Sequence, residues 1–254
     1  MKILTWNVNG IRAVVKKGFL DWLKASKADV VCLQEIKATP AQVPVELKEL
    51  QGWKGHYFPA KKPGYSGTAL LYRQAPDEIW TGLGEGRFDD EGRVLGGRWG
   101  ELQVVSAYFP NSQEAGKRLD YKVDFCKKIT SRLKALEKKG SQVVLCGDYN
   151  IAHQPIDLAR PEDNEESPGY FPQERAAMTE FLAAGFTDAF REQHPGEEGL
   201  YTWWSYRAAA RERNVGWRID YACTSPGLRS RTKKTWIESK VLGSDHCPVG
   251  IELK

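Results

Sequence analysis

Residues 143–150 read Val143-Val144-Leu145-Cys146-Gly147-Asp148-Tyr149-Asn150, a short apolar run that ends in polar residues. The apolar part is typical of a buried strand. It follows the longest helical pattern of the chain, residues 118–137, in which apolar side chains recur with helical spacing. A helix that leads into a buried strand indicates an α/β fold, and the polar end of the strand indicates a functional edge.

The same alternation of strand and helix patterns runs through the whole chain. Periodicity predicts strands at residues 3–6, 30–33, 68–72, 94–99, 102–109, 143–145, 219–223 and 249–253. It predicts helices over residues 19–23, 118–137 and 171–184. No linker-like tract divides the 254 residues, and the aperiodic segment 151–170 is typical of a functional loop. We therefore expect one domain, residues 1–254, with mixed sheets and functional loops at strand ends.

Composition excludes several classes of protein. With 41% hydrophobic and 28% charged residues, the chain is not disordered, and its net charge of +4 permits a nucleic-acid partner without requiring one. No stretch approaches the roughly 18 apolar residues of a membrane span, and the first residues resemble a strand rather than a signal peptide. The five cysteines are widely spaced, so we expect neither disulfides nor a cysteine zinc site. These features predict a cytoplasmic protein with no membrane partner.

Polar side chains collect where the strand patterns end. They are Asn7 and Asn9, Gln34 and Glu35, Tyr108 and Asn111, Asp148 and Asn150, Asp220, and Asp245 with His246. Each alone is unremarkable, because Asn and Asp commonly cap turns, but their joint occurrence at strand ends favours a site. Carboxylate and amide oxygens suit Mg²⁺ or Mn²⁺ better than zinc, and no nucleophile motif or P-loop accompanies them. The residues thus predict metal-assisted hydrolysis with water as the attacking group.

Several of these residues lie in longer motifs that follow one another in a fixed order. The motifs are Trp6-Asn7-Val8-Asn9-Gly10-Ile11-Arg12, Leu33-Gln34-Glu35-Ile36-Lys37, Gly64-Tyr65-Ser66-Gly67, Tyr108-Phe109-Pro110-Asn111, Cys146-Gly147-Asp148-Tyr149-Asn150-Ile151-Ala152-His153, Trp217-Arg218-Ile219-Asp220-Tyr221 and Gly243-Ser244-Asp245-His246-Cys247-Pro248. With them the chain resembles the exonuclease III/AP endonuclease family of the endonuclease–exonuclease–phosphatase superfamily, over nearly its whole length. The resemblance implies a four-layered α/β sandwich, two packed mixed β-sheets flanked by helices, with the site at one edge.

The resemblance also implies roles for individual residues in a Mg²⁺-dependent reaction, with Mn²⁺ as a substitute. The metal ligands would be Glu35, assisted by Asn7, Asn9 and Asp245, with Asp148 and Asn150 nearby. Asp148 would orient or deprotonate the attacking water, and Asn150 would position Asp148. His246 would donate to a phosphate oxygen, with Asp220 holding its imidazole. Tyr108 and Asn111 would contact the phosphate.

Substrate choice would rest on a segment rich in aromatic and basic residues. Trp203, Trp217 and Ile219 match positions that line a pocket for a baseless deoxyribose, although core packing is the usual fate of Trp. Further DNA contacts are expected from Asn111, Asn164, Arg207 and Tyr65. Residues 205–218 hold four Arg and one Glu, a charge of +3, whereas residues 162–166 hold four acids. The basic segment is expected to border the metal site and touch the DNA backbone.

The expected activity is hydrolysis of the phosphodiester 5′ to an abasic site in duplex DNA, leaving a 3′-OH. 3′→5′ exonuclease and 3′-phosphatase activities would accompany it. The partner would be double-stranded DNA with abasic sites or damaged 3′ ends, bound by a monomer. Two alternatives stay open: an inositol-polyphosphate or lipid phosphatase of the same superfamily, and a non-catalytic protein that binds damaged DNA. Position 9 is Asn where many relatives carry Asp, which weakens its expected metal role.

Overall fold

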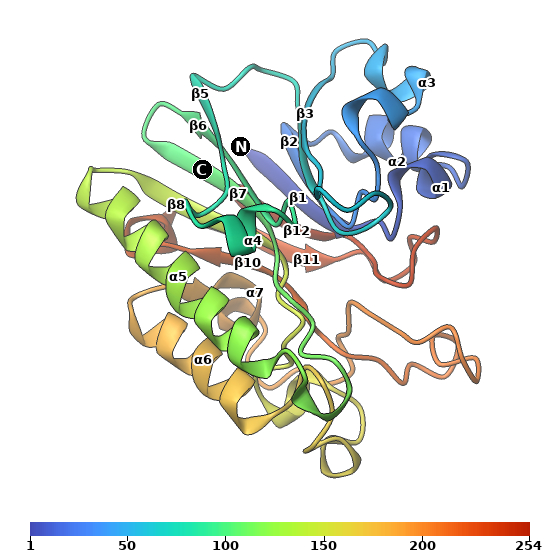
Figure 1. The fold of residues 1–254 in the computed structure, drawn as a ribbon, viewed down its shortest axis with the longest axis vertical. Helices are drawn as coiled ribbons and strands as arrows, with labels where there is room; N and C mark the ends of the chain where they lie inside the picture. Colours follow the sequence, from blue (N-terminus) through green and yellow to red (C-terminus); the bar gives the residue numbers. More distant parts are fainter.

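Two six-stranded β-sheets pack face to face in the computed structural model, which describes residues 1–254 (Figure 1). The first sheet has the order β11 (Thr232–Ile237), β12 (Val249–Leu253), β1 (Lys2–Asn7), β2 (Val30–Gln34), β4 (Thr68–Tyr72) and β3 (Lys54–Phe58). The second has the order β5 (Glu78–Thr81), β6 (Val94–Trp99), β7 (Leu102–Tyr108), β8 (Gln142–Asp148), β10 (Asp220–Thr224) and β9 (Thr187–Asp188). Each sheet is mixed, with one parallel pair, β1–β2 or β7–β8.

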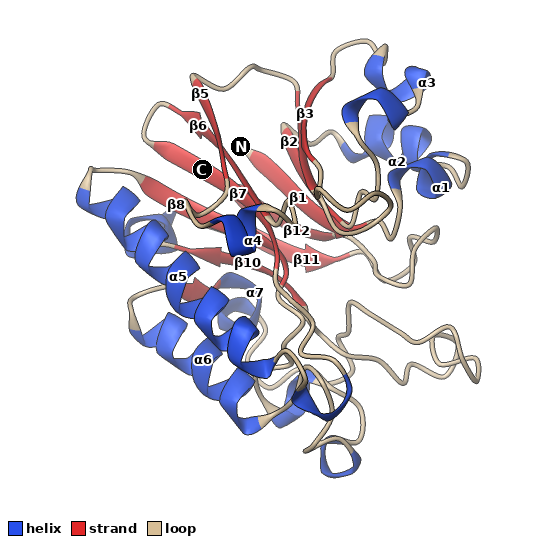
Figure 2. Ribbon diagram, in the orientation of Figure 1, coloured by secondary structure: helices blue, strands red, loops and turns tan.

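Helices cover the outer face of each sheet and complete four layers (Figure 2). The first sheet carries α1 (Ile11–Val15), α2 (Phe19–Ser26) and α3 (Val45–Lys48), whose apolar side chains share one core with β1 and β2. The second carries α5 (Leu119–Lys138) and α6 (Pro172–Ala183), which pack side by side. The single-turn helices α4 (Gly86–Asp89) and α7 (Ala189–Gln193) lie in connections. The expected four-layered sandwich is confirmed.

The alternation of side chains along β8 explains why its sequence is apolar on both faces. Val143 and Leu145 belong to the core under α5 and α6, whereas Val144 and Cys146 belong to the core between the sheets. A strand buried on both faces reads as a continuous apolar run. Gly147 follows because a Cβ there would lie 1.8 Å from the carbonyl oxygen of Ala107 on β7. Residues 142–148 are therefore a central strand of the sandwich.

The strands that periodicity did not predict are all at sheet edges. β3 and β11 flank the first sheet, and β5 and β9 flank the second. Edge strands expose one rim and often carry charged residues that prevent further pairing, so they lack an apolar signature. Lys233 and Lys234 on β11 are exposed examples. Several expected boundaries also differ: β7 ends at Tyr108, β10 begins at Asp220, and β8 extends over Gln142–Asp148 where residues 143–145 were expected.

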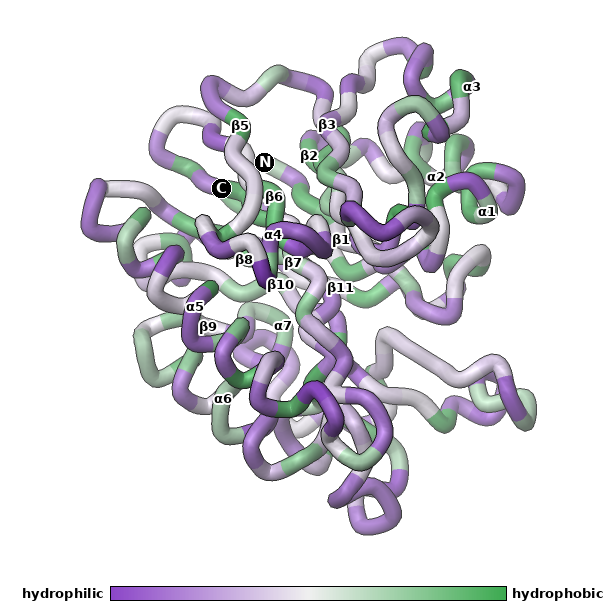
Figure 3. The backbone as a smooth tube through the Cα atoms, in the orientation of Figure 1, coloured by the Kyte–Doolittle hydropathy of each residue, from purple (hydrophilic) through white to green (hydrophobic).

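Loops collect at one end of the sandwich, where residues of segments 150–170 and 199–218 extend beyond the sheets (Figure 1). These loops are mostly hydrophilic, whereas apolar residues concentrate in the strands (Figure 3). Segment 151–170 contains only two short 3₁₀ turns, Pro155–Asp157 and Pro161–Asp163, in agreement with its aperiodic sequence. All five cysteines are free and buried, and no helix combines the length and hydrophobicity that crossing a membrane requires.

Candidate active site

The expected polar residues converge because the ends of two parallel strand pairs meet. Asn7 ends β1 beside Gln34 at the end of β2, and Tyr108 ends β7 beside Asp148 at the end of β8. Asp220 begins the antiparallel strand β10 directly opposite Asp148. Parallel strands place their carboxyl ends at one edge, and face-to-face packing brings the two edges together. The polar residues that follow or end these strands in the sequence therefore come together at one edge of the sandwich.

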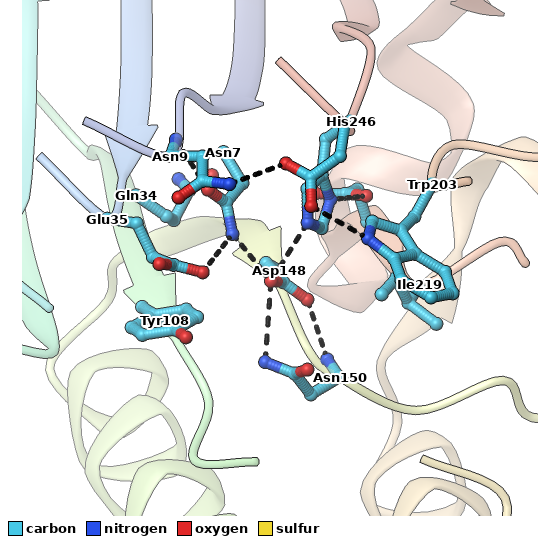
Figure 4. Close-up of polar contacts among 12 residues, drawn as sticks. Asn7, Asn9, Gln34, Glu35, Tyr108, Asp148, Asn150, Trp203, Ile219 and His246 are labelled. Atoms are coloured by element: carbon cyan, nitrogen blue, oxygen red, sulfur yellow. Dashed lines mark hydrogen bonds and ion pairs between the residues drawn. The ribbon is translucent and has the colours of Figure 1, made fainter. Parts of the chain in front are cut away.

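Three residues that follow these strands adopt left-handed backbone conformations. Asn9, Glu35 and Asn150 have φ of 47°, 50° and 51°. This region is sparsely populated by residues other than Gly, and such conformations concentrate at functional sites. The bends turn the side chains back toward the strand ends, and Figure 4 shows Glu35 directed at Asn7 and Asn150 directed at Asp148. Nothing in the local sequence signals the conformation at Glu35, because Glu is not a preferred residue there.

Asp148 lies at the centre of the site (Figure 4). Its Oδ2 accepts hydrogen bonds from Asn7 Nδ2 at 2.8 Å and Asn150 Nδ2 at 3.3 Å, and its Oδ1 accepts from the Asn150 backbone N–H at 2.8 Å. His246 Nε2 lies 3.8 Å from Oδ2. Burial raises the pKa of Asp148 to about 7, although the His246 imidazole opposes the rise. A carboxyl group with this pKa can accept a proton near neutral pH.

His246 is held by the carboxylate of Asp220. Its Nδ1 lies 2.8 Å from Asp220 Oδ2, which also accepts a hydrogen bond from Thr202 Oγ1 at 2.7 Å. Burial by itself lowers the pKa of His246, but the carboxylates of Asp220 and Asp148 more than offset this and raise it to about 10. The imidazole is therefore positively charged at neutral pH, with Nε2 aimed toward Asp148 and able to donate to an anion. The expected Asp220–His246 pair is present.

Replacement of Asp220 by Asn is expected to lower the pKa of His246 toward its ordinary value near 6.5. In wild type the protonated imidazole stabilises the fold fully below about pH 6.5, and this contribution is lost as the pH rises through about 10. Nitrogen-15 NMR of the histidine side chains across this range measures the titration directly. An unchanged His246 titration in Asp220→Asn would contradict the assigned origin of the raised pKa. His194, which is far along the chain and not in the site, serves as the internal control.

Oxygen donors gather on the other side of Asp148. Glu35 Oε1 accepts from the same Asn7 amide at 2.9 Å, so one amide nitrogen bridges the carboxylates of Glu35 and Asp148. Asp245 Oδ1 accepts from Asn9 Nδ2 at 3.0 Å. Burial raises the pKa of Glu35, but the Lys37 ammonium and the Asn7 hydrogen bond outweigh it and give a lowered value. These hard, ionised oxygens fit a cation such as Mg²⁺ or Mn²⁺.

Two details refine the expected ligand set. The Asn7 side-chain oxygen already accepts the Asn9 backbone N–H at 3.0 Å, so its amide orients the carboxylates. Lys37, which sequence reasoning missed, places Nζ 2.8 Å from Glu35 Oε2 and 2.5 Å from Asn9 Oδ1. Its position two residues after Glu35 in the sequence was the available sign that it could contact that carboxylate. Asp220 Oδ1 is buried without a partner, and Asp148, Asp220 and His246 bring ligand atoms within 4.8 Å of one another.

A cavity of about 650 Å³ opens beside this centre. The expected site residues that line it are Glu35, Tyr108, Asn111, Asp148, Asn150, Asn164, Trp203, Arg207, Trp217, Ile219, Asp245 and His246. Trp203 and Trp217 meet edge to face at 6.3 Å and are only half-buried, whereas Trp204 is buried in the core. Trp203 also donates from Nε1 to Asp245 Oδ2 at 3.1 Å. The apolar wall of the cavity is thus tied to the polar centre.

Tyr65 and Arg93 stand behind Tyr108 rather than in the cavity lining. The buried Arg93 guanidinium lies 4.7 Å from the centre of the Tyr108 ring and donates to the Tyr108 carbonyl oxygen at 2.9 Å. It also donates to the Tyr65 hydroxyl at 2.9 Å, which Arg118 reaches at 3.0 Å. A buried arginine gave no signal in the sequence, because Arg is usually exposed. Tyr65 is therefore placed where it supports Tyr108.

The basic segment is less basic at the surface than its sequence indicates. Arg218 is buried and pairs with Asp157 at 2.8 Å and Asp188 at 2.7 Å, so counting it toward a basic surface was wrong. Arg211 donates to three backbone carbonyl groups and lies over the Trp204 ring at 4.6 Å. Arg207 and Arg213 stay exposed at the cavity. A count of charges within one segment overlooks ion pairs with distant residues, such as those that neutralise Arg218.

The acidic run faces the same cavity from the opposite loop. Asp163 and Asn164 line the cavity, while Glu162, Glu165 and Glu166 are exposed. Asn164 donates to the Arg160 carbonyl oxygen at 2.8 Å and accepts from Ser167 Oγ at 3.1 Å. The amide of Asn164 is therefore engaged within its own loop.

Comparison with known proteins relates this arrangement to characterised enzymes. The model of the Endonuclease/Exonuclease/phosphatase family matches residues 4–246. The chain is 44% identical to an exodeoxyribonuclease of Bacillus subtilis (strain 168) over 98% of both chains. It is 40% identical to the DNA repair nuclease APEX1 of Danio rerio, with 100% of this chain and 82% of the relative covered.

Solved structures show the same likeness over the whole chain. An AP endonuclease from Archaeoglobus fulgidus superposes with a TM-score of 0.89 at 28% identity, covering 100% of this chain and 99% of that one. The 3′ phosphatase NExo from Neisseria, bound to a product DNA hairpin, gives a TM-score of 0.89 at 28% identity with the same coverage.

Proposed function

We propose, because the chain belongs to the endonuclease/exonuclease/phosphatase family, that it cleaves the phosphodiester bond 5′ to an abasic site in duplex DNA and leaves a 3′-OH. The protein is a DNA-repair nuclease and a hydrolase. The observation that carries the choice of substrate is the apolar wall beside the Asp148–His246 centre, formed by the half-buried Trp203 and Trp217 with the buried Ile219. Such a wall suits a sugar without a base, which also costs least to extrude from the helix.

The family's nucleases depend on a metal ion, and we propose Mg²⁺, with Mn²⁺ as a substitute. Glu35 would be the principal ligand, with help from Asp245 and with Asn7 and Asn9 orienting the carboxylates. When bound, the ion supplies positive charge that neutralises the phosphate and the leaving oxygen. Hard oxygen donors support this choice over zinc, since the site offers no thiolate.

The chain's own residues would perform the proton and charge steps. Asp148 would accept a proton from the attacking water, as its pKa of about 7 permits, while Asn150 and Asn7 hold both of its oxygens. The His246 imidazolium would donate from Nε2 to a non-bridging phosphate oxygen as negative charge develops. Tyr108 and Asn111 would contact the same phosphate from the cavity wall. Donors fixed before the reaction stabilise the transition state without reorganisation.

One substrate panel tests the proposal. Duplex DNA with a single abasic-site analogue is compared with undamaged, nicked and 3′-phosphate duplexes, each with Mg²⁺, Mn²⁺ or a chelator. Metal-dependent incision 5′ to the abasic site as the main reaction is the expected result. Activity only at 3′ ends would contradict the proposed main substrate and leave an exonuclease or 3′-phosphatase.

The two alternatives from the sequence are less well supported. A lipid or inositol-polyphosphate phosphatase has no need of a paired Trp wall, and the relatives named above are nucleases. A non-catalytic DNA-binding protein has no need of an intact Asp220–His246–Asp148 arrangement.

We propose that residues 1–254 form one domain, since the core between the sheets includes residues from Ile3 to Leu253. A monomer located in the cytoplasm stays a prediction.

Truncation of Trp217 to Ala is expected to lower kcat/KM on the abasic-site duplex by about 10–100-fold, the range expected for loss of an aromatic contact to an extruded nucleotide. Cleavage at 3′-phosphate ends should change by less than about threefold, because the polar centre is untouched. Trp99→Ala is the matched control, since Trp99 pairs with Leu102 at the opposite end of β6 and β7. Equal losses on both substrates would contradict a role for Trp217 in selecting the abasic site.

A further inference from the structure

A second pair of buried charges lies behind the active site, outside the cavity lining. Lys122 on α5 and Glu174 on α6 are both fully buried, and Lys122 Nζ lies 2.7 Å from Glu174 Oε1. Burying an ion pair costs desolvation that its attraction barely offsets, so such a pair is weak evidence for stability.

Both charges use their remaining hydrogen bonds on the active-site loops. Lys122 Nζ also donates to the backbone carbonyl oxygen of Asn150 at 2.5 Å. Glu174 Oε2 accepts from the backbone N–H groups of Gly169 at 2.7 Å and Phe171 at 3.0 Å. One buried pair thus joins the end of strand β8 to the loop that forms the far wall of the cavity.

The Asn150 carbonyl is a sensitive point of the site. Asn150 is in the left-handed conformation, and its backbone N–H and side-chain Nδ2 both donate to Asp148. The Asn150 carbonyl oxygen belongs to the peptide that joins Asn150 to Ile151, so the Lys122 contact restrains ψ of Asn150 and helps to hold this residue in the conformation that aims its donors at Asp148. Asn111 donates to the side-chain Oδ1 of Asn150 at 3.2 Å, so Asp148 and Asn111, both in the cavity lining, contact the same residue.

The Glu174 carboxylate restrains the loop at residues 169–171 as Lys122 restrains Asn150. It fixes Gly169, whose carbonyl oxygen accepts from Ala152 N–H at 2.8 Å. A Cβ at Gly169 would lie 3.1 Å from the Asn150 carbonyl oxygen and 3.3 Å from the Trp217 ring. The loop, the Asn150 peptide and the aromatic wall are therefore in close contact around this ion pair.

We propose that Lys122 and Glu174 are positioning residues that hold Asn150 against Asp148 during phosphodiester hydrolysis. The pair touches neither the substrate nor the reacting atoms and acts through the Asn150 peptide. The inference rests on the proposed function for its substrate, but the Asn150–Asp148 contact serves hydrolysis at abasic sites and at 3′ ends alike. A displacement of about 1 Å at a reacting group lowers rates by roughly 100-fold, so loss of the contact should be visible in kcat.

Two double variants separate this role from stability. Lys122→Met/Glu174→Gln and Lys122→Gln/Glu174→Gln both remove the two charges together, which avoids a lone buried charge. They are called here the Met variant and the Gln variant after the residue that replaces Lys122. Only the Gln variant keeps a donor for the Asn150 carbonyl oxygen. We expect the Met variant to lose about 10–100-fold in kcat on both abasic-site and 3′-phosphate duplexes, with KM within about threefold. The Gln variant should keep kcat within about threefold of wild type.

Leu133→Ala is the stability control, because Leu133 is buried in the core under α5, three turns along the helix from Lys122. It should lower the melting temperature without lowering kcat. Equal kcat in wild type and the folded Met variant would overturn the proposal. If the Met variant is unfolded at the assay temperature, the Gln variant decides: kcat within threefold supports the proposal, and a loss beyond tenfold overturns it.

The wild-type measurement keeps the two proposals apart. Wild type that cleaves only 3′ ends contradicts the proposed abasic-site function, and the variants are then compared on the 3′-phosphate duplex. Wild type that cleaves the abasic site while the Met variant is equally active contradicts the positioning role alone.

Discussion

Asp148→Asn is expected to lower kcat on abasic-site duplex DNA by about 10³–10⁴-fold, near the upper end of what a general base contributes. The substitution keeps the size of the side chain and removes its ability to accept a proton. Asp148 is the only carboxylate in the site held by the amides of both Asn7 and Asn150, so no neighbour has the same geometry. The loss should therefore appear in single-turnover rates at saturating enzyme.

The variant is expected to stay folded, because burial already disfavours the ionised form of Asp148, whose pKa is raised to about 7. A neutral amide avoids that cost, although one hydrogen bond from Asn7 or Asn150 must be rearranged. Thermal melts followed by circular dichroism check this. Asp163→Asn is the matched control, since Asp163 is an exposed carboxylate in the same cavity. It should retain activity within about threefold, and full activity of Asp148→Asn would remove Asp148 from the proposed mechanism.

The central strands and the site at their ends could be predicted from sequence because both signals are local. A strand buried on both faces is apolar throughout, as in Val143–Leu145, and the polar residues follow directly along the chain. The meeting of the strand ends could also be expected without details of the packing. Each parallel pair, β1–β2 and β7–β8, has both carboxyl ends at the same edge of its sheet. The place of Asp148 therefore followed from its position just after the apolar run 143–145, at the end of β8.

The buried cations could not be predicted in the same way. Arg93, Lys122 and Arg218 look like surface residues in the sequence, yet each is buried. For Lys122 and Arg218 the ion-pair partners lie far along the chain, 52 residues away at Glu174 and 61 residues away at Asp157, whereas Arg93 pairs with the nearby Glu91. A single sequence contains no local pattern for such pairs, because burial of each charge depends on the other. The Lys122–Glu174 pair contacts Asn150 and Gly169 of the cavity lining, so the sequence indicated the polar residues at the strand ends but not this buried pair behind them.

The left-handed conformations of Asn9 and Asn150 could be predicted only in part. Asn tolerates this conformation, so Asn9 and Asn150 are compatible with it, but nothing required it in advance. At Asn150 the conformation is held by contacts from β8, α5 and the Phe109 carbonyl oxygen together. Tertiary contacts of this kind decide whether a tolerated conformation is adopted.

Glu35→Gln is expected to weaken Mn²⁺ binding by at least about 10–100-fold, since even residues that only orient metal ligands have effects of this size. Glu35 is an ionised carboxylate of the centre with 18% of its side chain exposed, and its lowered pKa keeps it charged at neutral pH. The Gln side chain can still accept the Asn7 hydrogen bond but carries no charge. Isothermal titration calorimetry with Mn²⁺ measures the loss without reference to activity.

The same variant separates metal binding from the rest of the site. Cleavage at low Mg²⁺ should fall by about 10²-fold or more and recover in part as the metal concentration rises, because mass action fills a weakened site. Glu162→Gln is the control, an exposed acid in the loop opposite, and it should leave both Mn²⁺ affinity and cleavage unchanged. Lys37 is released from Glu35 in the variant but keeps Asn9, so a modest loss of stability is expected. Unchanged Mn²⁺ affinity would show that the ion is held elsewhere, with Asp148, Asp220 and His246 as the remaining cluster of ligands.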